Sequence, residues 1–312
     1  MISEKKPLII IGGATAVGKT KVSVMLAKKI NGEIVSADSM QIYKGMDIGT
    51  AKIRPEETEG IPHYMIDIAD PEDDFSVYDY KNRAQKYIND IHKRGKIPLL
   101  VGGTGFYIQS VLYDIDFNEE GEDKGFRESL KPLSNEDLHA MLERSDPDSA
   151  AAIHPNNRKR VIRALEYYHS HNEPISAHNR TESQKTSPYA YAYFVLNRKR
   201  EEIYGRIEER VDKMFEEGLI EEVKNLLDKG VSNDAVSMQA IGYKETAAYL
   251  KGKISLEEAI SQIKQNTRHY AKRQITWFKR EEGAVWLDYG DFSDEEKIVL
   301  KILEILKEKK IV

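Results

Sequence analysis

The sequence contains no cysteine in 312 residues. A chain without cysteine forms no disulfide, holds no iron–sulfur cluster or cysteine-ligated zinc, and has no thiol nucleophile. It also lacks the run of ~20 apolar residues that spans a bilayer, and its opening apolar run is too short for a signal-peptide core. We therefore predict a cytoplasmic protein without a membrane partner.

An excess of positive charge is missing as well. Lys and Arg number 47 against 52 Asp and Glu, which gives a formal net charge of −5. This balance lacks the global basic signature of a nucleic-acid binder. Local basic patches can still bind nucleic acid, so that class of partner stays open. The length exceeds the usual size of one core and favours two domains.

Short apolar runs alternate with helical spacing in the first third of the chain. We predict strands over 8–11, 32–39 and 97–105, with helices following the first of them and over 76–96. This order is typical of an α/β fold with a mostly parallel sheet flanked by helices. Ligands of such sheets sit beyond the carboxyl ends of the strands, so the loops that follow these three strands are expected to converge.

The pattern of predicted secondary structure changes near residue 118. Residues 118–185 contain helical pieces broken by prolines and no strand-like run, whereas strand character returns at 188–197 and 284–289. Further helices are expected over 199–229 and 256–281. We predict a core domain of residues 1–117 plus 186–312, interrupted by a small inserted helical domain of residues 118–185.

The stretch "GGATAVGKT" has the spacing of a phosphate-binding loop between a strand and a helix. Its glycines let backbone amides approach an anion, the helix N-terminus adds a positive dipole end, and the lysine adds a full charge. The predicted diphosphate-binding residues are Gly13, Ala14, Thr15, Ala16, Val17, Gly18, Lys19 and Thr20. The Thr20 hydroxyl is the predicted ligand of Mg²⁺. The pattern alone does not say which phosphate compound is bound.

The position of the nearest carboxylate separates two kinds of phosphate-loop protein. Phosphate-loop ATPases carry an acidic residue after an apolar strand to hold the metal. Here the strand "IPLLVGGTG" ends in glycines and Thr104, and Asp38 stands at the end of another strand. That place suits a residue that acts on the group being modified. The alternative, in which Asp38 only caps the following turn, stays open.

Six segments together resemble the tRNA dimethylallyltransferases of the bacterial type, and they occur in the family's order. They are "GATAVGKT", "SADSMQIYKGMDIGTAK", "PLLVGGTGFY", "HPNNRKRVIRALE", "MQAIGYKE" and "AKRQITWF". The resemblance implies a phosphate-loop NTPase-like core that transfers a dimethylallyl group from dimethylallyl diphosphate to N6 of adenine 37. The tRNAs concerned read codons that begin with U. The loop would then hold the leaving group rather than ATP.

The resemblance also implies roles for single residues. Asp38 would accept the proton of the adenine amine, Thr15 would lie at the reacting centre, and Arg210 would contact the diphosphate. Arg206, four residues before Arg210, shares its helical face. Surface ion pairs with nearby glutamates are the alternative for both arginines. By resemblance the tRNA contacts are Asp38, Ser39, Met40, Gln41, Thr104, Arg127, Lys159, Arg160, Val161, Ile162, Arg163, Gln239, Ala240, Ile241, Gly242, Tyr243 and Lys244.

Two basic clusters could supply the phosphate contacts that tRNA requires. One gathers Arg158, Lys159, Arg160 and Arg163 at the head of a predicted helix. The other places Lys264, Arg268 and Lys272 at successive i+4 positions, with Tyr270, Arg273, Trp277 and Arg280 on a neighbouring face. From these we add Lys272 and Arg273 to the predicted tRNA contacts. A solvated face or a network of ion pairs is the alternative for each cluster.

Two other functions remain possible from the residues alone. One is a phosphate-loop kinase that uses ATP on a nucleoside or small metabolite, and the other is a nucleotide-dependent switch without chemistry of its own. For the preferred function we expect the tRNA anticodon stem-loop as the macromolecular partner, Mg²⁺ as the cofactor, and a monomeric protein.

Overall fold

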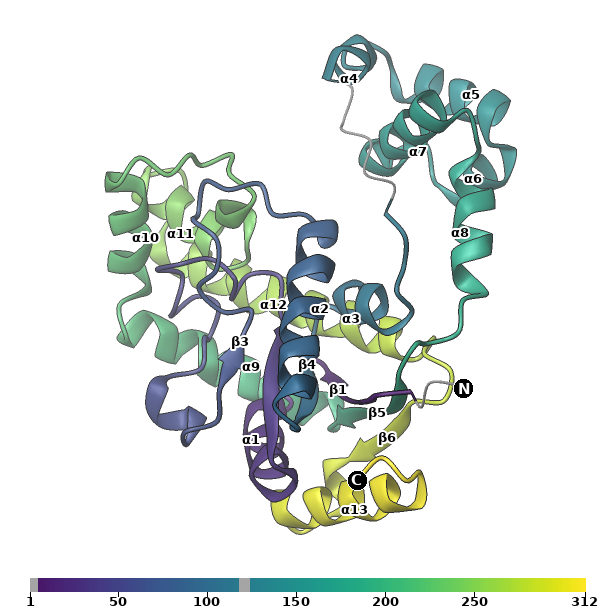
Figure 1. The fold of residues 1–312 in the computed structure, drawn as a ribbon. Coiled ribbons are helices and arrows are strands. Elements are labelled where there is room, and N and C mark those ends of the chain that lie inside the picture. The colour runs from purple at the N-terminus through teal and green to yellow at the C-terminus, as the bar shows by residue number, and fades with distance from the viewer. Residues whose placement is uncertain (1–4, 118–123) are drawn as a thin grey trace. The chain divides into compact units, whose positions relative to one another are not determined.

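The computed structural model describes residues 5–117 and 124–312, and the chain forms two compact units (Figure 1). Unit 1 comprises Met1–Leu112 and Ser187–Val312, and unit 2 comprises Tyr113–Thr186. The predicted start of the insertion, residue 118, lies outside the described residues. No helix in the described ranges has the length and apolar character needed to cross a bilayer.

Unit 1 is built on a six-stranded sheet in which every pairing is parallel. The strand order is β3-β2-β4-β1-β5-β6. The strands are β1 (Pro7–Gly13), β2 (Gly32–Ala37), β3 (His63–Tyr64), β4 (Ile97–Gly102), β5 (Ala190–Asn197) and β6 (Val285–Asp288). The predicted α/β class with a mostly parallel sheet is therefore confirmed. Strand β3 has only two residues, too few to leave a periodic signal in the sequence.

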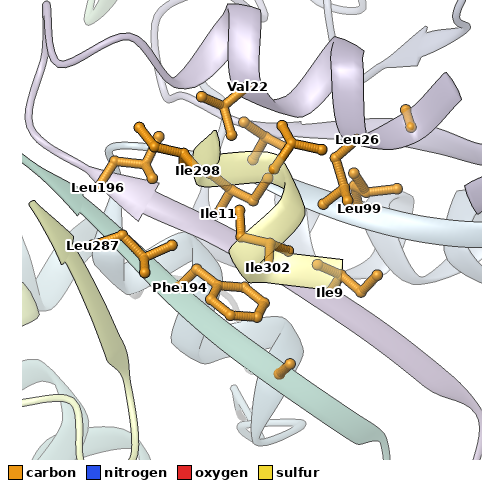
Figure 2. Close-up of a cluster of buried hydrophobic side chains, with 14 of the residues drawn as sticks. Ile9, Ile11, Val22, Leu26, Leu99, Phe194, Leu196, Leu287, Ile298 and Ile302 are labelled. Atoms are coloured by element: carbon orange, nitrogen blue, oxygen red, sulfur yellow. The ribbon is translucent and has the colours of Figure 1, made fainter. Parts of the chain in front are cut away.

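Helices cover both faces of this sheet, so the central strand β1 is apolar on both sides. Helices α1 (Lys19–Ile30) and α13 (Glu295–Glu308) pack together on one face. Their side chains meet Ile9, Ile11 and Phe194 in the core drawn in Figure 2. Helices α2 (Val77–Lys93), α3 (Gly105–Leu112) and α12 (Leu256–Phe278) also contact the sheet, and Phe278 of α12 lies against Tyr193 of β5.

A second core joins four helices to the long connection after β2. The helices are α9 (Arg200–Glu216), α10 (Leu219–Asp228), α11 (Tyr243–Leu250) and α12. The predicted helix over 199–229 is two helices, because Gly218 adopts a φ of 102° between them. Single turns of 3₁₀ helix, η1 (Pro55–Thr58), η2 (Ser237–Gln239) and η3 (Tyr289–Asp291), complete the unit.

The described part of unit 2 is helical. It contains α4 (Lys124–Leu130), α5 (Asn135–Ser145), α6 (Pro147–Ala152), α7 (Arg158–His171) and α8 (Ile175–Ser183). A small core around Leu138, Leu142 and Val161 holds the helices together. The buried Asp146 adds a polar tie, since its carboxylate accepts hydrogen bonds from the amides and hydroxyls of Ser149 and Ser176.

Candidate active site at the carboxyl edge of the sheet

Three loops meet where β2, β4 and β1 end side by side. The register pairs Gly102 of β4 with Ala37 of β2 on one side and Gly12 of β1 on the other. Thr104 joins the first two loops, because its amide donates to Ala37 O over 3.1 Å and its Oγ1 accepts from the Ser39 amide over 3.1 Å. The predicted convergence of the three loops is therefore present.

The lysine of the phosphate loop binds the backbone of the same loop. Lys19 Nζ donates to the carbonyls of Gly13 and Ala14 over 2.9 and 2.8 Å. Burial lowers the pKa of Lys19 to about 8, against the opposing effect of the Asp38 charge, and the neighbouring Arg210 lowers it further. At the start of α1, Gly18 adopts a φ of 108°, which favours glycine. A side chain at Gly18 would also collide with the hydroxyl of Tyr289.

Three arginines surround this loop, and each donates to a neutral oxygen of it. Arg206 Nε donates to Ala16 O over 2.7 Å, and Arg198 Nε donates to Val17 O over 3.1 Å. Arg210 Nη1 donates to Thr15 Oγ1 over 3.4 Å, and burial beside Arg206 lowers the pKa of Arg210. The structure thus brings Arg206 and Arg210 to the loop. Arg198 was not predicted, because it precedes α9 and shares no helical spacing with the other two.

Asp38 uses one of its two carboxylate oxygens in the turn that follows it. Oδ1 accepts hydrogen bonds from the amides of Met40 and Gln41 over 2.9 and 3.3 Å. Oδ2 accepts none from any residue within 5–117 and 124–312. The capping role left open by the sequence is real, and it leaves the second oxygen for another partner.

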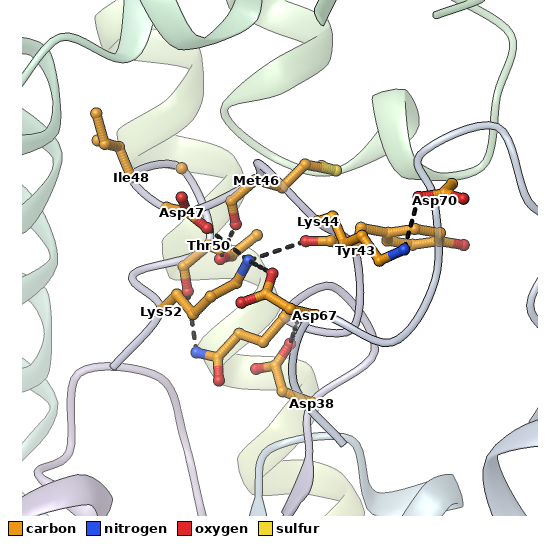
Figure 3. A network of polar contacts seen from close by, with 12 residues as sticks. Asp38, Tyr43, Lys44, Met46, Asp47, Ile48, Thr50, Lys52, Asp67 and Asp70 are labelled. Carbon is orange, nitrogen blue, oxygen red and sulfur yellow. Dashed lines mark hydrogen bonds and ion pairs between the residues drawn. The ribbon is translucent and has the colours of Figure 1, made fainter. Parts of the chain in front are cut away.

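A buried lysine, Lys52, anchors the loop after Asp38 (Figure 3). The side chain of Lys52 is 5% exposed, and its Nζ donates to Tyr43 O over 2.9 Å and to Asp47 and Asp67 over 2.6 Å each. Gln41 Nε2 donates to the carbonyls of residues 50 and 51. A buried ammonium with two carboxylates and a carbonyl is fully partnered, so this network fixes the loop.

The carboxylate of Glu222 ties this loop to the segment 239–244. Glu222 of α10 accepts hydrogen bonds from the amides of Asp47, Ile48 and Gly49, and from the Tyr243 hydroxyl over 2.6 Å. Burial raises the pKa of Tyr243 well above its usual range. Among the predicted tRNA contacts of this segment, Gln239 and Lys244 are exposed, Ile241 is half-buried, and Ala240, Gly242 and Tyr243 are buried.

The predicted contacts in unit 2 also divide by exposure. Lys159, Arg160 and Arg163 are exposed on α7, whereas Val161 lies in the core and Ile162 packs against it. Arg158 does not belong with the exposed group, because its guanidinium donates to the carbonyls of residues 130, 131 and 133. Arg127 forms an ion pair with the buried Glu166 over 2.9 Å.

The basic row on α12 splits in the same way. Lys264 pairs with Asp212 over 2.7 Å and Arg268 pairs with Glu208 over 2.8 Å, both on α9. Lys272 and Arg273 are exposed, and the Arg273 guanidinium lies 5.8 Å from the ring centre of Tyr270. The ion-pair alternative therefore describes the first two cations and not the last two.

Aromatic side chains near these loops differ in exposure. Phe106 is 41% exposed and stands edge-on to Trp277 with ring centres 6.2 Å apart. Tyr43 and Tyr107 are buried, and Tyr107 stacks on Tyr80. Of these three aromatic residues in the loops, Phe106 is the exposed one.

Two further residues of α12 reach the site and were not predicted there. Tyr270 contacts Thr104 and Gln274 through its hydroxyl, and burial together with the charge of Asp38 raises its pKa to about 12. Gln274 is buried between the phosphate loop and the loop after β4. Their i, i+4 spacing puts both on one face of the helix. In the sequence, however, that face is indistinguishable from the row of cations beside it.

A parallel sheet with a phosphate loop after its central strand defines a phosphate-loop NTPase-like α/β protein. The chain resembles the crystal structure of the full-length tRNA isopentenylpyrophosphate transferase from Bacillus halodurans, with 46% identity, a TM-score of 0.74, and coverage of 98% of this chain and 97% of that one. It also resembles a eukaryotic dimethylallyltransferase acting on tRNA, with 32% identity, a TM-score of 0.84, and coverage of 97% and 80%.

Residues 41–281 match the model of the IPP transferase family. The chain belongs to this family. A curated tRNA dimethylallyltransferase from Lachnoclostridium phytofermentans is 52% identical over 98% of this chain and 99% of its own length. Another, from Bacillus subtilis, is 51% identical over 92% of each chain. The predicted family is thus confirmed.

Proposed function

We propose that this protein transfers a dimethylallyl group from dimethylallyl diphosphate to N6 of adenine 37, in tRNAs that read codons beginning with U. Diphosphate is the second product. The shared name of the curated relatives supports prenyl transfer to tRNA and does not favour the kinase alternative. We place the reaction in the cytoplasm with a monomeric enzyme.

The observation that carries the proposal is the arrangement of the three adjacent strand ends. β1 ends in an anion-binding loop, β2 leads into the carboxylate of Asp38, and β4 between them ends in glycines and Thr104. No acidic residue lies within 97–112, the part of the chain where a phosphate-loop ATPase carries its metal-holding acid after the strand. The site therefore combines a cradle for a leaving anion with a proton acceptor, which is what alkylation of an amine requires.

The reaction needs stabilisation of negative charge on one side and removal of a proton on the other. As the allylic C–O bond breaks, its electron pair goes to the diphosphate and a C–N bond forms to the adenine amine. Lys19, Arg210 and the loop amides become better partners of the diphosphate as its charge grows, so they lower the barrier. Asp38 Oδ2 accepts the proton lost by N6, a contribution worth about 10²–10⁴-fold.

Mg²⁺ fits this site only if the diphosphate supplies most of its ligands. Within 5–117 and 124–312 no group of three His, Cys, Asp or Glu residues could hold a metal by itself. The exposed Thr20 at the start of α1 offers one hydroxyl. Mg²⁺ commonly takes few protein ligands and completes its shell with phosphate oxygens and water. When bound, the ion would neutralise part of the diphosphate charge.

An adenine reaches such a site only after leaving its base stack, at a cost of a few kcal/mol. Contacts with the phosphates of the anticodon stem-loop must offset that cost. The exposed cations Lys159, Arg160 and Arg163 on α7, with Lys272 and Arg273 on α12, are suited to this task. Phe106 offers a ring on which an unstacked base could lie.

Radiolabelled dimethylallyl diphosphate and unmodified tRNA provide the test. We expect label in tRNA, and digestion to nucleosides should locate it on N6 of adenine 37. Asp38→Asn keeps an oxygen for the Met40 and Gln41 amides, so the turn should persist while turnover falls about 10²–10⁴-fold. Binding of both substrates should remain. Phosphorylation of a nucleoside by labelled ATP, without prenylated tRNA, would overturn the proposal in favour of a kinase.

A further inference from the structure

Gln274 connects the two glycine-rich loops through a single side chain. It lies on α12 and is 5% exposed. Its Oε1 accepts a hydrogen bond from the Thr15 amide over 2.8 Å, and its Nε2 donates to Gly103 O over 3.0 Å. Both ends of the amide are therefore used, one on the loop after β1 and one on the loop after β4.

The second loop is shaped to admit this side chain. A Cβ built at Gly103 would lie 2.2 Å from Gln274 Nε2, which is far inside any permitted contact. The Gln274 amide therefore occupies the space that a side chain at position 103 would take. A residue larger than glycine would push the amide away from Gly103 O and, through the same side chain, away from Thr15.

Each loop that Gln274 binds holds a group of the proposed reaction. Thr15, whose amide it binds, receives the Arg210 guanidinium on its hydroxyl. Gly103, whose carbonyl it binds, precedes Thr104, which bonds the backbone on both sides of Asp38 through Ala37 O and the Ser39 amide. Gln274 thus lies between the contacts of the leaving anion and those of the proton acceptor.

We propose that Gln274 is a positioning residue that fixes the spacing between the phosphate loop and Asp38. This inference rests on the proposed function, because it assigns Gln274 a part in that reaction. The amide's hydrogen bonds go to the two loops, so its loss should leave ground-state binding in place and impair the geometry of attack. A displacement of about 1 Å at a reacting centre can cost on the order of 10²-fold in rate.

Two variants separate positioning from a general loss of stability. Gln274→Met keeps the length and the apolar volume and removes the hydrogen bonds to both loops. Gln274→Asn keeps an amide that is one methylene too short to reach both loops. We expect kcat to fall about 10²-fold in the first variant and at least tenfold in the second. KM for dimethylallyl diphosphate and for tRNA should stay within about threefold of the wild type in both, because the cost falls on the transition state.

Asn266→Leu is the matched control on the same helix. Asn266 Nδ2 donates to the buried Glu245 over 2.7 Å, away from both glycine-rich loops. This change should lower the melting temperature, as loss of a buried hydrogen bond does, and leave kcat unchanged. Every variant is assayed at a temperature at which circular dichroism shows it folded.

The outcomes distinguish the inference from the function beneath it. A wild-type kcat in folded Gln274→Met, with melting temperature reduced as in the control, would reduce Gln274 to a structural residue and overturn the inference alone. A rise in both KM values at constant kcat would overturn it too. Failure of the wild-type protein to prenylate tRNA would overturn the proposed function, and this inference with it.

Discussion

Three cations at the phosphate loop and two cations on α12 have different kinds of partner. Lys19 and Arg206 donate to backbone carbonyls, and Arg210 donates to a hydroxyl. Lys264 and Arg268 instead face the carboxylates of Asp212 and Glu208. A carbonyl or hydroxyl orients a cation and leaves its charge in place, whereas a carboxylate neutralises it. We therefore expect the first group of cations to be available to an anionic ligand, and the second group only to join two helices.

Exposed cations on one helix also differ in whether a carboxylate pairs with them, so a count of basic residues overstates the charge available to a ligand. Lys272 and Arg273 stand on the same helix as Lys264 and Arg268 and are exposed without a carboxylate partner in the described residues. Surface ion pairs contribute little to stability, so the paired cations are expected to matter least. Four measurements test this division.

The largest effect is expected at Lys19. Lys19→Met removes the full charge that faces the departing diphosphate, so kcat/KM should fall about 10²–10³-fold, the usual cost of losing one charge-stabilising donor. Steady-state prenylation of tRNA gives this value. Lys21→Met serves as the control, because Lys21 is exposed and pairs with Glu295 on α13. Equal losses in the two variants would abolish the division between the two kinds of cation.

Single substitutions of Arg210 and Arg268 compare the two kinds of arginine in the same assay. Arg210→Gln should lower kcat/KM about 10-fold to 100-fold, the range given by a hydrogen bond to a charged group. Arg268→Gln should leave it unchanged, because only the contact with Glu208 is lost. The assay is the same for both variants. A larger effect at Arg268 would mean that its ion pair opens to receive tRNA.

The lowered pKa of Lys19 predicts how diphosphate binding depends on pH. A bound anion favours the protonated lysine, so Lys19 should add no pH dependence to the affinity below pH 8. Above the pKa of about 8 the free protein loses this proton, and binding must restore it. The Kd for dimethylallyl diphosphate should therefore rise with pH above 8, by up to about tenfold per unit. Calorimetric titrations of the wild type and Lys19→Met check this, and a rise of equal size in the variant would contradict it.

The smallest effect concerns salt. The double variant Lys272→Gln with Arg273→Gln should have a KM for tRNA a few-fold higher than that of the wild type. It should also reduce the magnitude of the log–log salt slope by about 1.5, because two phosphate contacts no longer release counterions. The matched double variant Lys264→Gln with Arg268→Gln should keep the wild-type slope. If the second pair changed the slope and the first did not, the assignment of the two pairs would be reversed.

The fold was predictable because its signals are local. Runs such as "LIII" followed by glycines identify buried strands, and strand–helix alternation allows few topologies. The convergence of the three loops followed from that topology alone. Helix α13 lies outside the predicted elements, although Ile298, Ile302 and Leu306 recur at helical spacing. The sequence therefore carries a signal for α13, whereas the two-residue strand β3 carries none and is placed by tertiary packing.

The site was predictable only in part, because partner choice is a property of the fold. Nothing in the sequence distinguishes Arg206, which donates to a carbonyl, from Arg268, which pairs with a glutamate. Gln274 is an ordinary helix residue until α12 is placed against two loops more than 150 residues away along the chain. The roles predicted for Asp38, Thr15 and Arg210 stay predictions until variants are assayed.

The position of β1 in the sheet has a consequence for how the protein is made. Of the six strands, β1 is the first to leave the ribosome. Its neighbour β5 begins about 90 residues after β4 ends, and synthesis of that stretch takes on the order of 5–20 s. During that time one side of the nascent sheet presents unpaired amides and carbonyls on an apolar strand. A fragment ended at residue 186 is therefore expected to bind chaperones or to self-associate, whereas extension through β5 should relieve both.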